Sequence, residues 1–184
     1  MYRAHYSLKP KTMINKNIEK ALNEQVEKEA YSSALYLAMA SWAENKGMPG
    51  VAEWLYLQSD EERLHMLKFV KYINERGGKA EISALKQPGK DYASVKTMFD
   101  EVLKHERFIS NSINDIVALC IGEKDFTTQH WLQWFVNEQI EEEANVTKII
   151  DKLNLSGEHN LYLFDRDIVA MRAAAAKAGA EAGA

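Results

Sequence analysis

One histidine and a recurring set of glutamates are the residues most able to bind metal ions. Glu62 and His65 are three positions apart, so on a helix their side chains would be neighbours. Further acidic residues lie midway along three other long segments, at Glu29, Glu106 and either Glu142 or Glu143. Carboxylates with one imidazole and no thiolate suit iron or manganese better than copper(I) or a structural zinc ion. Iron is the ion we expect.

Long segments without glycine or proline must position these residues. The three prolines and nine glycines leave five uninterrupted segments. Such lengths are typical of helices rather than strands. We therefore predict helices within residues 11–46, 51–76, 90–121, 123–156 and 158–178.

The acidic residues lie at the centre of apolar stripes that repeat at helical spacing. At about 100° per residue, Glu29 falls within about 20° of Leu22 on the apolar face of the first helix. Glu62 and His65 share the stripe of the second helix, and Glu106 is central in the third. All of them are expected to point inward.

The fourth helix leaves its acidic ligand undecided. Gln139 is central, whereas Glu142 and Glu143 flank the stripe on its two sides. The periodicity alone does not choose between these two glutamates.

Burial of so many carboxylates requires a counter-charge. An unpaired buried carboxylate costs several kcal/mol. The neighbouring basic residues are displaced by about 100° or more from the inward acids; they are Lys28, Arg63, Lys104 and Arg107. A bound cation is the simplest remedy. Glu62 could bridge two ions about 3.5 to 4 Å apart, one held by Glu29 and His65 and the other by Glu106 and Glu142.

Each of these residues has an ordinary structural interpretation when it is taken alone. A single inward glutamate is more often paired or turned to solvent, and a single inward histidine is more often a satisfied core residue. The remaining histidines, which have no acidic layer around them, are interpreted as structural or exposed: His5, His105, His130 and His159. The coincidence on four helices favours the metal site.

The connections between the predicted helices determine the topology. The first and third connections are short, so they join antiparallel neighbours. The second, residues 77–94, could reach about 59 Å, more than the roughly 39 Å length of the second helix. The predicted fold class is therefore all-α, a ferritin-like four-helix bundle with one long crossover between the second and third helices and a short fifth helix at the C-terminal end.

Composition narrows the partners and the compartment. The net charge of -4 and the predicted pI of 5.8 argue against a nucleic-acid partner. No apolar run is long enough to span a membrane. One cysteine excludes an internal disulfide, and without an apolar signal-peptide core the expected compartment is the cytoplasm. We divide the chain into an N-terminal extension (1–12), one ferritin-like domain (13–172) and an Ala/Gly-rich tail (173–184) that we expect to fray.

Over residues 13–171 the chain resembles the ferritin family, and specifically the non-haem bacterial ferritins. The order and spacing of several short motifs carry this resemblance: Asn23-Glu24-Gln25, the segment from Glu29 to Tyr36, Glu61-Glu62-Arg63-Leu64-His65, Glu106, and the segment from Asn137 to Glu143.

The resemblance implies a role for individual residues. Glu29, Glu62 and His65 are similar to the ligands of the first ferroxidase iron, and Glu62, Glu106 and Glu142 to those of the second, which favours Glu142 over Glu143. Gln139 is similar to the glutamine beside the second iron, and Tyr36 to the tyrosine that supplies an electron during oxidation. The outer third iron site of bacterial members would use Glu61, Glu138, Glu141 and Glu142.

Departures from the motifs exclude two related classes. Arg63 stands where bacterioferritin has its haem-ligating methionine, so no haem is expected, and Asn145 replaces the second histidine of that family. One cysteine cannot build the small iron domain of rubrerythrin-like peroxidases.

The expected function is iron storage with ferroxidase activity, in which O₂ or peroxide oxidises Fe²⁺ at the di-iron centre. The resemblance implies a homo-oligomeric shell of twenty-four chains, with Leu161 to Met171 as the short fifth helix near its four-fold axes. Two alternatives remain: a cage subunit that stores iron without oxidising it, and a di-iron oxygenase or peroxidase that acts on an organic substrate. Particle size distinguishes the oxygenase or peroxidase, expected to be a monomer or dimer, from an iron-storage protein, expected to form a shell.

Overall fold

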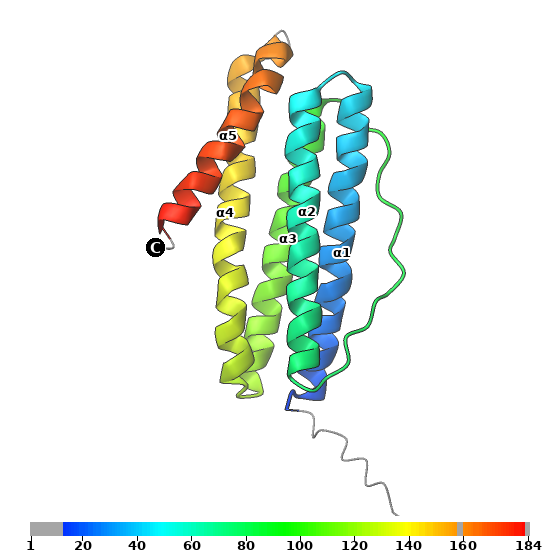
Figure 1. Ribbon diagram of the computed structural model, residues 1–184, viewed down its shortest axis with the longest axis vertical. Helices are drawn as coiled ribbons and strands as arrows, with labels where there is room; N and C mark the ends of the chain where they lie inside the picture. Colours follow the sequence, from blue (N-terminus) through cyan, green and yellow to red (C-terminus); the bar gives the residue numbers. More distant parts are fainter. Residues whose placement is uncertain (1–12, 158–159, 183–184) are drawn as a thin grey trace, which may run out of the picture.

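The computed structural model describes residues 13–157 and 160–182, and its regular elements there are all helices. They are α1 (Lys16–Asn45), α2 (Pro49–Glu75), α3 (Val95–Gly122), α4 (Phe126–Ser156) and α5 (Leu161–Ala182). The first four lie side by side as a bundle, and α5 runs at an angle along the outside of α4 (Figure 1). The predicted all-α bundle with a fifth helix is confirmed, while the predicted extension 1–12 lies outside the described residues. None of the described helices is long and apolar enough to cross a membrane.

Local signals set where the helices begin. Asn15, Ser94 and Asp125 precede α1, α3 and α4, and each side chain accepts a hydrogen bond from a backbone N–H of the first turn. Pro49 is the first residue of α2, where a missing N–H costs nothing. Gly47, with φ of 77°, makes the tight turn between α1 and α2. Short turns of this kind hold the paired helices antiparallel.

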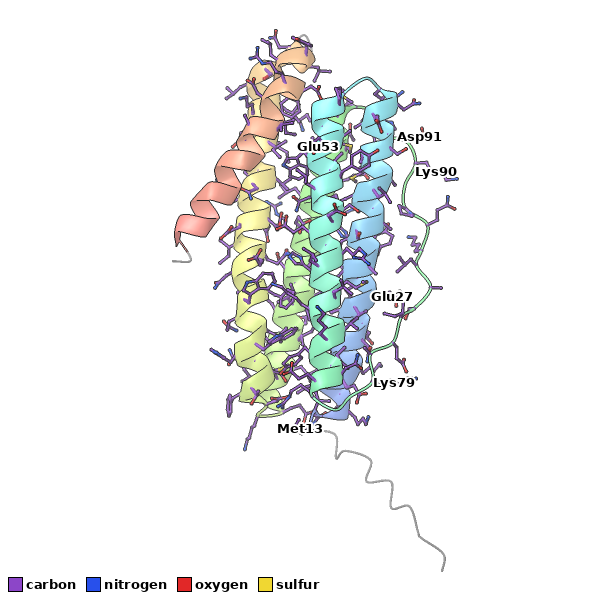
Figure 2. The ribbon with its side chains drawn as sticks, in the orientation of Figure 1. Met13, Glu27, Glu53, Lys79, Lys90 and Asp91 are labelled. Carbon is purple, nitrogen blue, oxygen red and sulfur yellow. The ribbon has the colours of Figure 1, made fainter. Side chains whose placement is uncertain are left out.

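One long connection joins the two helix pairs, as predicted. It runs beside α1 from one end of the bundle to the other (Figure 1), with Lys79, Lys90 and Asp91 along it (Figure 2). Its beginning is attached to α1, because the Lys79 N–H donates to Glu19 Oε1 at 2.9 Å and Asn23 Nδ2 donates to the Lys79 carbonyl at 3.1 Å. The connection therefore brings α3 back to the end of the bundle where α2 begins.

The interior consists of two apolar clusters with a polar layer between them. Along α1, one cluster ends at Val26 and the other begins at Leu35. The same change occurs on the other three helices, between Leu55 and Phe69, Val102 and Ile109, and Phe135 and Val146. Each interval contains the glutamates singled out from the sequence. The fold thus places four acidic segments at one level of the bundle.

The fifth helix is longer than the predicted range of Leu161 to Met171. It continues to Ala182 and so includes most of the segment that we assigned to the tail. The reason is composition, because alanine has the highest helix propensity and the two glycines of this segment lie near its end. The domain boundary at residue 172 and the fraying of the tail stay predictions.

Candidate metal centre

Glu29, Glu62 and His65 form a compact group of potential ligands, which we call the inner group. Each offers one ligand atom, and these atoms lie within 4.8 Å of one another. Glu29 comes from α1, while Glu62 and His65 lie one turn apart on α2, with Nδ1 of His65 3.6 Å from Oε2 of Glu62. All three side chains are at most 3% exposed. The helical i, i+3 spacing therefore brings the predicted pair together.

The carboxylates of the inner group lack enough hydrogen-bond donors. Oε1 of Glu29 accepts from Nε2 of Gln25 at 2.8 Å. Among the described residues, no amide, hydroxyl or amine donates to Oε2 of Glu29 or to either carboxylate oxygen of Glu62, and the two carboxyl groups contact each other. Buried carboxylate oxygens without donors are costly, and a cation bound between them would offset that cost. Carboxylate oxygens with one imidazole suit iron.

The second half of the acidic layer comes from α3 and α4. Glu106 is 1% exposed and accepts a hydrogen bond from the Tyr36 hydroxyl, while Glu142 is 5% exposed and accepts from Nε2 of Gln58 at 2.8 Å. Both glutamates act electrostatically on Glu62. Glu62 therefore senses the charges of the α3 and α4 carboxylates and also belongs to one group with Glu29, and these are the residues that it would join as a bridging ligand.

Gln139 lies beside Glu106, and its neighbours determine how its amide is turned. The single proton of the Ser110 hydroxyl is donated to Glu143 Oε1 at 2.6 Å, so Ser110 can only accept from Gln139. With its nitrogen turned this way, Gln139 donates to Ser110 Oγ at 3.0 Å and to Glu106 Oε2 at 3.3 Å. Gln139 thus acts as a donor to the layer.

Burial shifts the protonation of the whole layer. Burial raises the pKa of Glu29 well above its usual value, and the charge of Glu62 adds to the shift. The pKa of Glu62 is raised for the same first reason, then by the charge of Glu106. Burial raises the pKa of Glu106 to about 7, although the Tyr36 hydroxyl opposes the shift. Burial therefore favours the protonated form of these carboxyl groups when no cation is bound, and a bound ion would displace such protons.

The structure distinguishes Glu142 from Glu143. Glu142 is buried in the acidic layer, whereas Glu143 is half-buried, accepts from Ser110 and lies 3.6 Å from Nε of Arg107. The side chain of Glu143 therefore contacts Ser110 and Arg107 at the edge of the bundle and does not enter the acidic layer. Of the two candidates left open by periodicity, Glu142 is the one in the layer.

A second group of potential ligands, which we call the outer group, consists of Glu61, Glu138 and again His65. Their ligand atoms also lie within 4.8 Å of one another, but both glutamates are only partly buried. Glu141 is exposed and acts on Glu138 only through its charge. Lys68 interacts electrostatically with Glu138 and Glu61. The third-site prediction thus has two of its four residues in one group with His65.

Comparisons with known proteins agree with this geometry. Residues 19–156 match the Ferritin family, described as a ferritin-like domain. The chain belongs to the ferritin family. It is 40% identical over 158 residues to a bacterial non-heme ferritin of Campylobacter jejuni, which covers 85% of this chain and 95% of that protein. A probable bacterial non-heme ferritin-like protein of Haemophilus influenzae is 41% identical, with 85% and 96% covered.

A solved structure gives the same result for the fold. An open pore ferritin from the archaeon Archaeoglobus fulgidus superimposes with a TM-score of 0.84 at 36% identity, covering 86% of this chain and 98% of that one. As a member of the ferritin family, the chain is an iron-storage protein. The recognition made from the motifs is therefore confirmed.

Sequence reasoning missed how one basic residue of this ferritin-family chain reaches the interior. We expected Lys28 to point away because it is displaced by about 100° from Glu29. Instead, Nζ of Lys28 donates to the buried Ser112 hydroxyl at 2.6 Å. A long side chain can bend back over such an angle, which a helical-wheel argument ignores. The one sequence feature that could have indicated a polar contact here is Gln25, a polar residue one turn before Glu29.

The expectation for His105 agrees with its surroundings. His105 lies beside Ser32, with Nε2 2.7 Å from the Ser32 hydroxyl, and burial lowers its pKa to about 4. A neutral ring with a hydroxyl partner is a satisfied structural histidine.

Proposed function

We propose that this ferritin-family chain is a ferroxidase that oxidises Fe²⁺ at the acidic layer and delivers Fe³⁺ to a mineral inside a shell. Glu29, Glu62 and His65 would hold one iron ion, and Glu62, Glu106 and Glu142 a second. Gln139 would assist beside the second ion. We expect no haem, because Arg63 is an exposed cation at the position that a haem ligand would need.

The unpartnered carboxylate oxygens of Glu29 and Glu62 carry this proposal. They lie in a buried layer between two apolar clusters, where an unpaired charge is costly. Iron ions are the substrate that would satisfy them. Anionic oxygen ligands favour the harder Fe³⁺ over Fe²⁺, so the same residues that bind the substrate promote its oxidation.

The electrons and protons of the reaction balance as follows. Two ferrous ions give up one electron each, and these two electrons with two protons reduce O₂ to H₂O₂ or one H₂O₂ to two waters. Fe²⁺ binding displaces the protons held by Glu29, Glu62 and Glu106, since only the ionised carboxylate is a ligand. Tyr36 is positioned by its bond to Glu106, and burial raises the pKa of its phenol, which keeps it protonated. A protonated phenol could provide one further electron together with its proton, so that three ferrous ions and Tyr36 would supply the four electrons that, with four protons, reduce O₂ to two waters.

The remaining parts of the proposal concern assembly and transfer. We propose a shell of twenty-four chains with α5 at the four-fold axes, working in the cytoplasm, as the likeness to bacterial ferritins suggests. The outer group, together with Glu141 and Glu142, would hold a third iron on its way out of the layer. Its partial exposure supports a transient site.

Rapid mixing with Fe²⁺ in air tests the proposal. We expect fast formation of Fe³⁺ absorbance by the wild-type protein and a much slower rise in a Glu62→Ala, His65→Ala variant. Glu53, on the same helix but exposed, provides the control: Glu53→Ala should oxidise iron at the wild-type rate. Equal rates in all three proteins would refute the assigned site, and a monomer or dimer on a sizing column would refute the shell.

A further inference from the structure

A chain of hydrogen bonds connects Lys28 at the edge of the bundle to Glu29 in the metal centre. Nζ of Lys28 donates to Oγ of Ser112 at 2.6 Å. The Ser112 hydroxyl donates to Oε1 of Gln25 at 2.6 Å, and Nε2 of Gln25 donates to Oε1 of Glu29 at 2.8 Å. Two helices contribute, because Ser112 lies on α3 and the others on α1.

Only one direction of donation is possible along this chain. An ammonium group has donors and no acceptor, so Ser112 must accept from Lys28 and its single proton must point to Gln25. The Gln25 amide then presents its oxygen to Ser112 and its nitrogen to Glu29. The cation at the start therefore determines the orientation of the amide two bonds away.

The surroundings make these bonds strong. Gln25 is fully buried and Ser112 is 7% exposed, while Nζ of Lys28 lies 5.9 Å from the centre of the Phe108 ring. Bonds in a poorly solvated environment are electrostatically stronger, and bonds that point the same way polarise one another. When a metal ion displaces the proton of Glu29, the last bond ends on a carboxylate and becomes charge-assisted.

We propose that Lys28, Ser112 and Gln25 are positioning residues that fix the Glu29 carboxylate for the first metal ion. Gln25 occupies Oε1 of Glu29, whereas no amide, hydroxyl or amine of the described residues donates to Oε2, and one oxygen of this carboxylate belongs to the inner group. Glu29 is thereby held to present a single oxygen to the metal. This inference rests on the proposed function only in taking Glu29 as a ligand.

Anaerobic titration with Co²⁺, read by its ligand-field absorption, tests this role without any oxidation. Ser112→Ala interrupts the chain and leaves every proposed ligand in place. We expect it to weaken Co²⁺ binding at the first site about fivefold to tenfold, the size of one ordinary net hydrogen bond, and to shift the absorption band. Ser112→Thr, which keeps a hydroxyl, should restore both.

In the Lys28→Met variant, the direction of the change in Co²⁺ affinity distinguishes the two explanations. Removal of a nearby positive charge would by simple electrostatics tighten the binding of a cation. If Lys28 acts through the chain, its loss weakens binding about twofold, less than Ser112→Ala because Ser112 can still donate to Gln25. Lys20→Met is the matched control on the same helix, since Lys20 is exposed and contacts only Glu24 at 3.8 Å among the described ion pairs. It should not weaken binding.

The double variant Lys28→Met, Ser112→Ala completes the test. Its loss should equal that of Ser112→Ala alone, because a chain that is already interrupted loses nothing further. Additive losses, wild-type binding by Ser112→Ala, or tighter binding by Lys28→Met would each overturn the inference. A Glu29→Gln variant separates the two proposals: if it leaves Co²⁺ binding unchanged, the assignment of Glu29 as a ligand is wrong as well.

Discussion

The inner and outer groups use the same residue types and share His65, yet they differ in what surrounds them. The inner carboxylates lie between two apolar clusters, and three of their oxygens have no donor among the described residues. The outer carboxylates of Glu61 and Glu138 are partly exposed and lie near the ammonium group of Lys68. Solvent and a protein cation can thus satisfy the outer group, whereas only a bound cation or protons can satisfy the inner one. Environment, rather than residue type, decides which glutamates need a bound cation or a proton to offset their burial.

The largest expected difference between the two groups is in the rate of Fe²⁺ oxidation, and it is tested at the adjacent residues Glu61 and Glu62. Glu62→Gln keeps the shape of the side chain but removes the charge that the inner group uses, so we expect the initial rate of Fe²⁺ oxidation to fall by about tenfold to a hundredfold or more. Glu61→Gln changes the neighbouring outer residue and should leave the initial rate near that of the wild type. Stopped-flow absorbance measures both. Equal losses in the two variants would show that the groups do not act separately.

The pH dependence of stability provides a second difference, of intermediate size. Burial raises the pKa of folded Glu106 from 4.5 to about 7, so the folded protein holds this proton more firmly than the unfolded chain does. That contribution to stability is complete below pH 4.5 and is lost as the pH rises towards 7. Glu29 and Glu62 are shifted in the same direction.

Urea unfolding of the metal-free protein across this range measures the effect. We expect Glu106→Gln to reduce the fall in the free energy of unfolding as the pH rises, because the amide has no proton to lose. Glu138→Gln in the outer group should have less effect, since Glu138 is only partly buried. An unchanged pH profile for Glu106→Gln would be inconsistent with a buried titrating carboxyl group.

Lys68 provides the smallest expected effect, confined to the outer group. Its ammonium lies 2.7 Å from the centre of the Trp134 ring and interacts with Glu138 and Glu61, so it competes with a metal ion there. Lys68→Met should tighten the binding of a third Co²⁺ by about twofold to fivefold, the effect of one partly screened charge. The exposed Lys71 on the same helix is the control for general charge effects. If the affinity for the third Co²⁺ per chain is unchanged in Lys68→Met, Lys68 does not compete with a metal ion at the outer group.

Much of the fold was predictable because helical periodicity is a strong signal over long segments. The inward direction of Glu29 and Glu106 followed from the residues on the same stripe, and both are 1% exposed. The choice between Glu142 and Glu143 did not follow from periodicity, because each flanks the stripe and only packing separates them; the resemblance to bacterial ferritins was needed to favour Glu142. The course of Lys28 was unpredictable for a different reason, since a flexible side chain of four methylenes selects its partner from the tertiary structure.

Anaerobic titration of the purified protein with Fe²⁺ tests the central claim most directly. If buried acidic residues from four helices form a two-ion centre, the wild-type protein will bind two ferrous ions per chain tightly, and Glu62→Gln will lose tight binding of both. A wild-type protein without tight Fe²⁺ binding, or a Glu62→Gln variant that binds as the wild type does, would contradict the account.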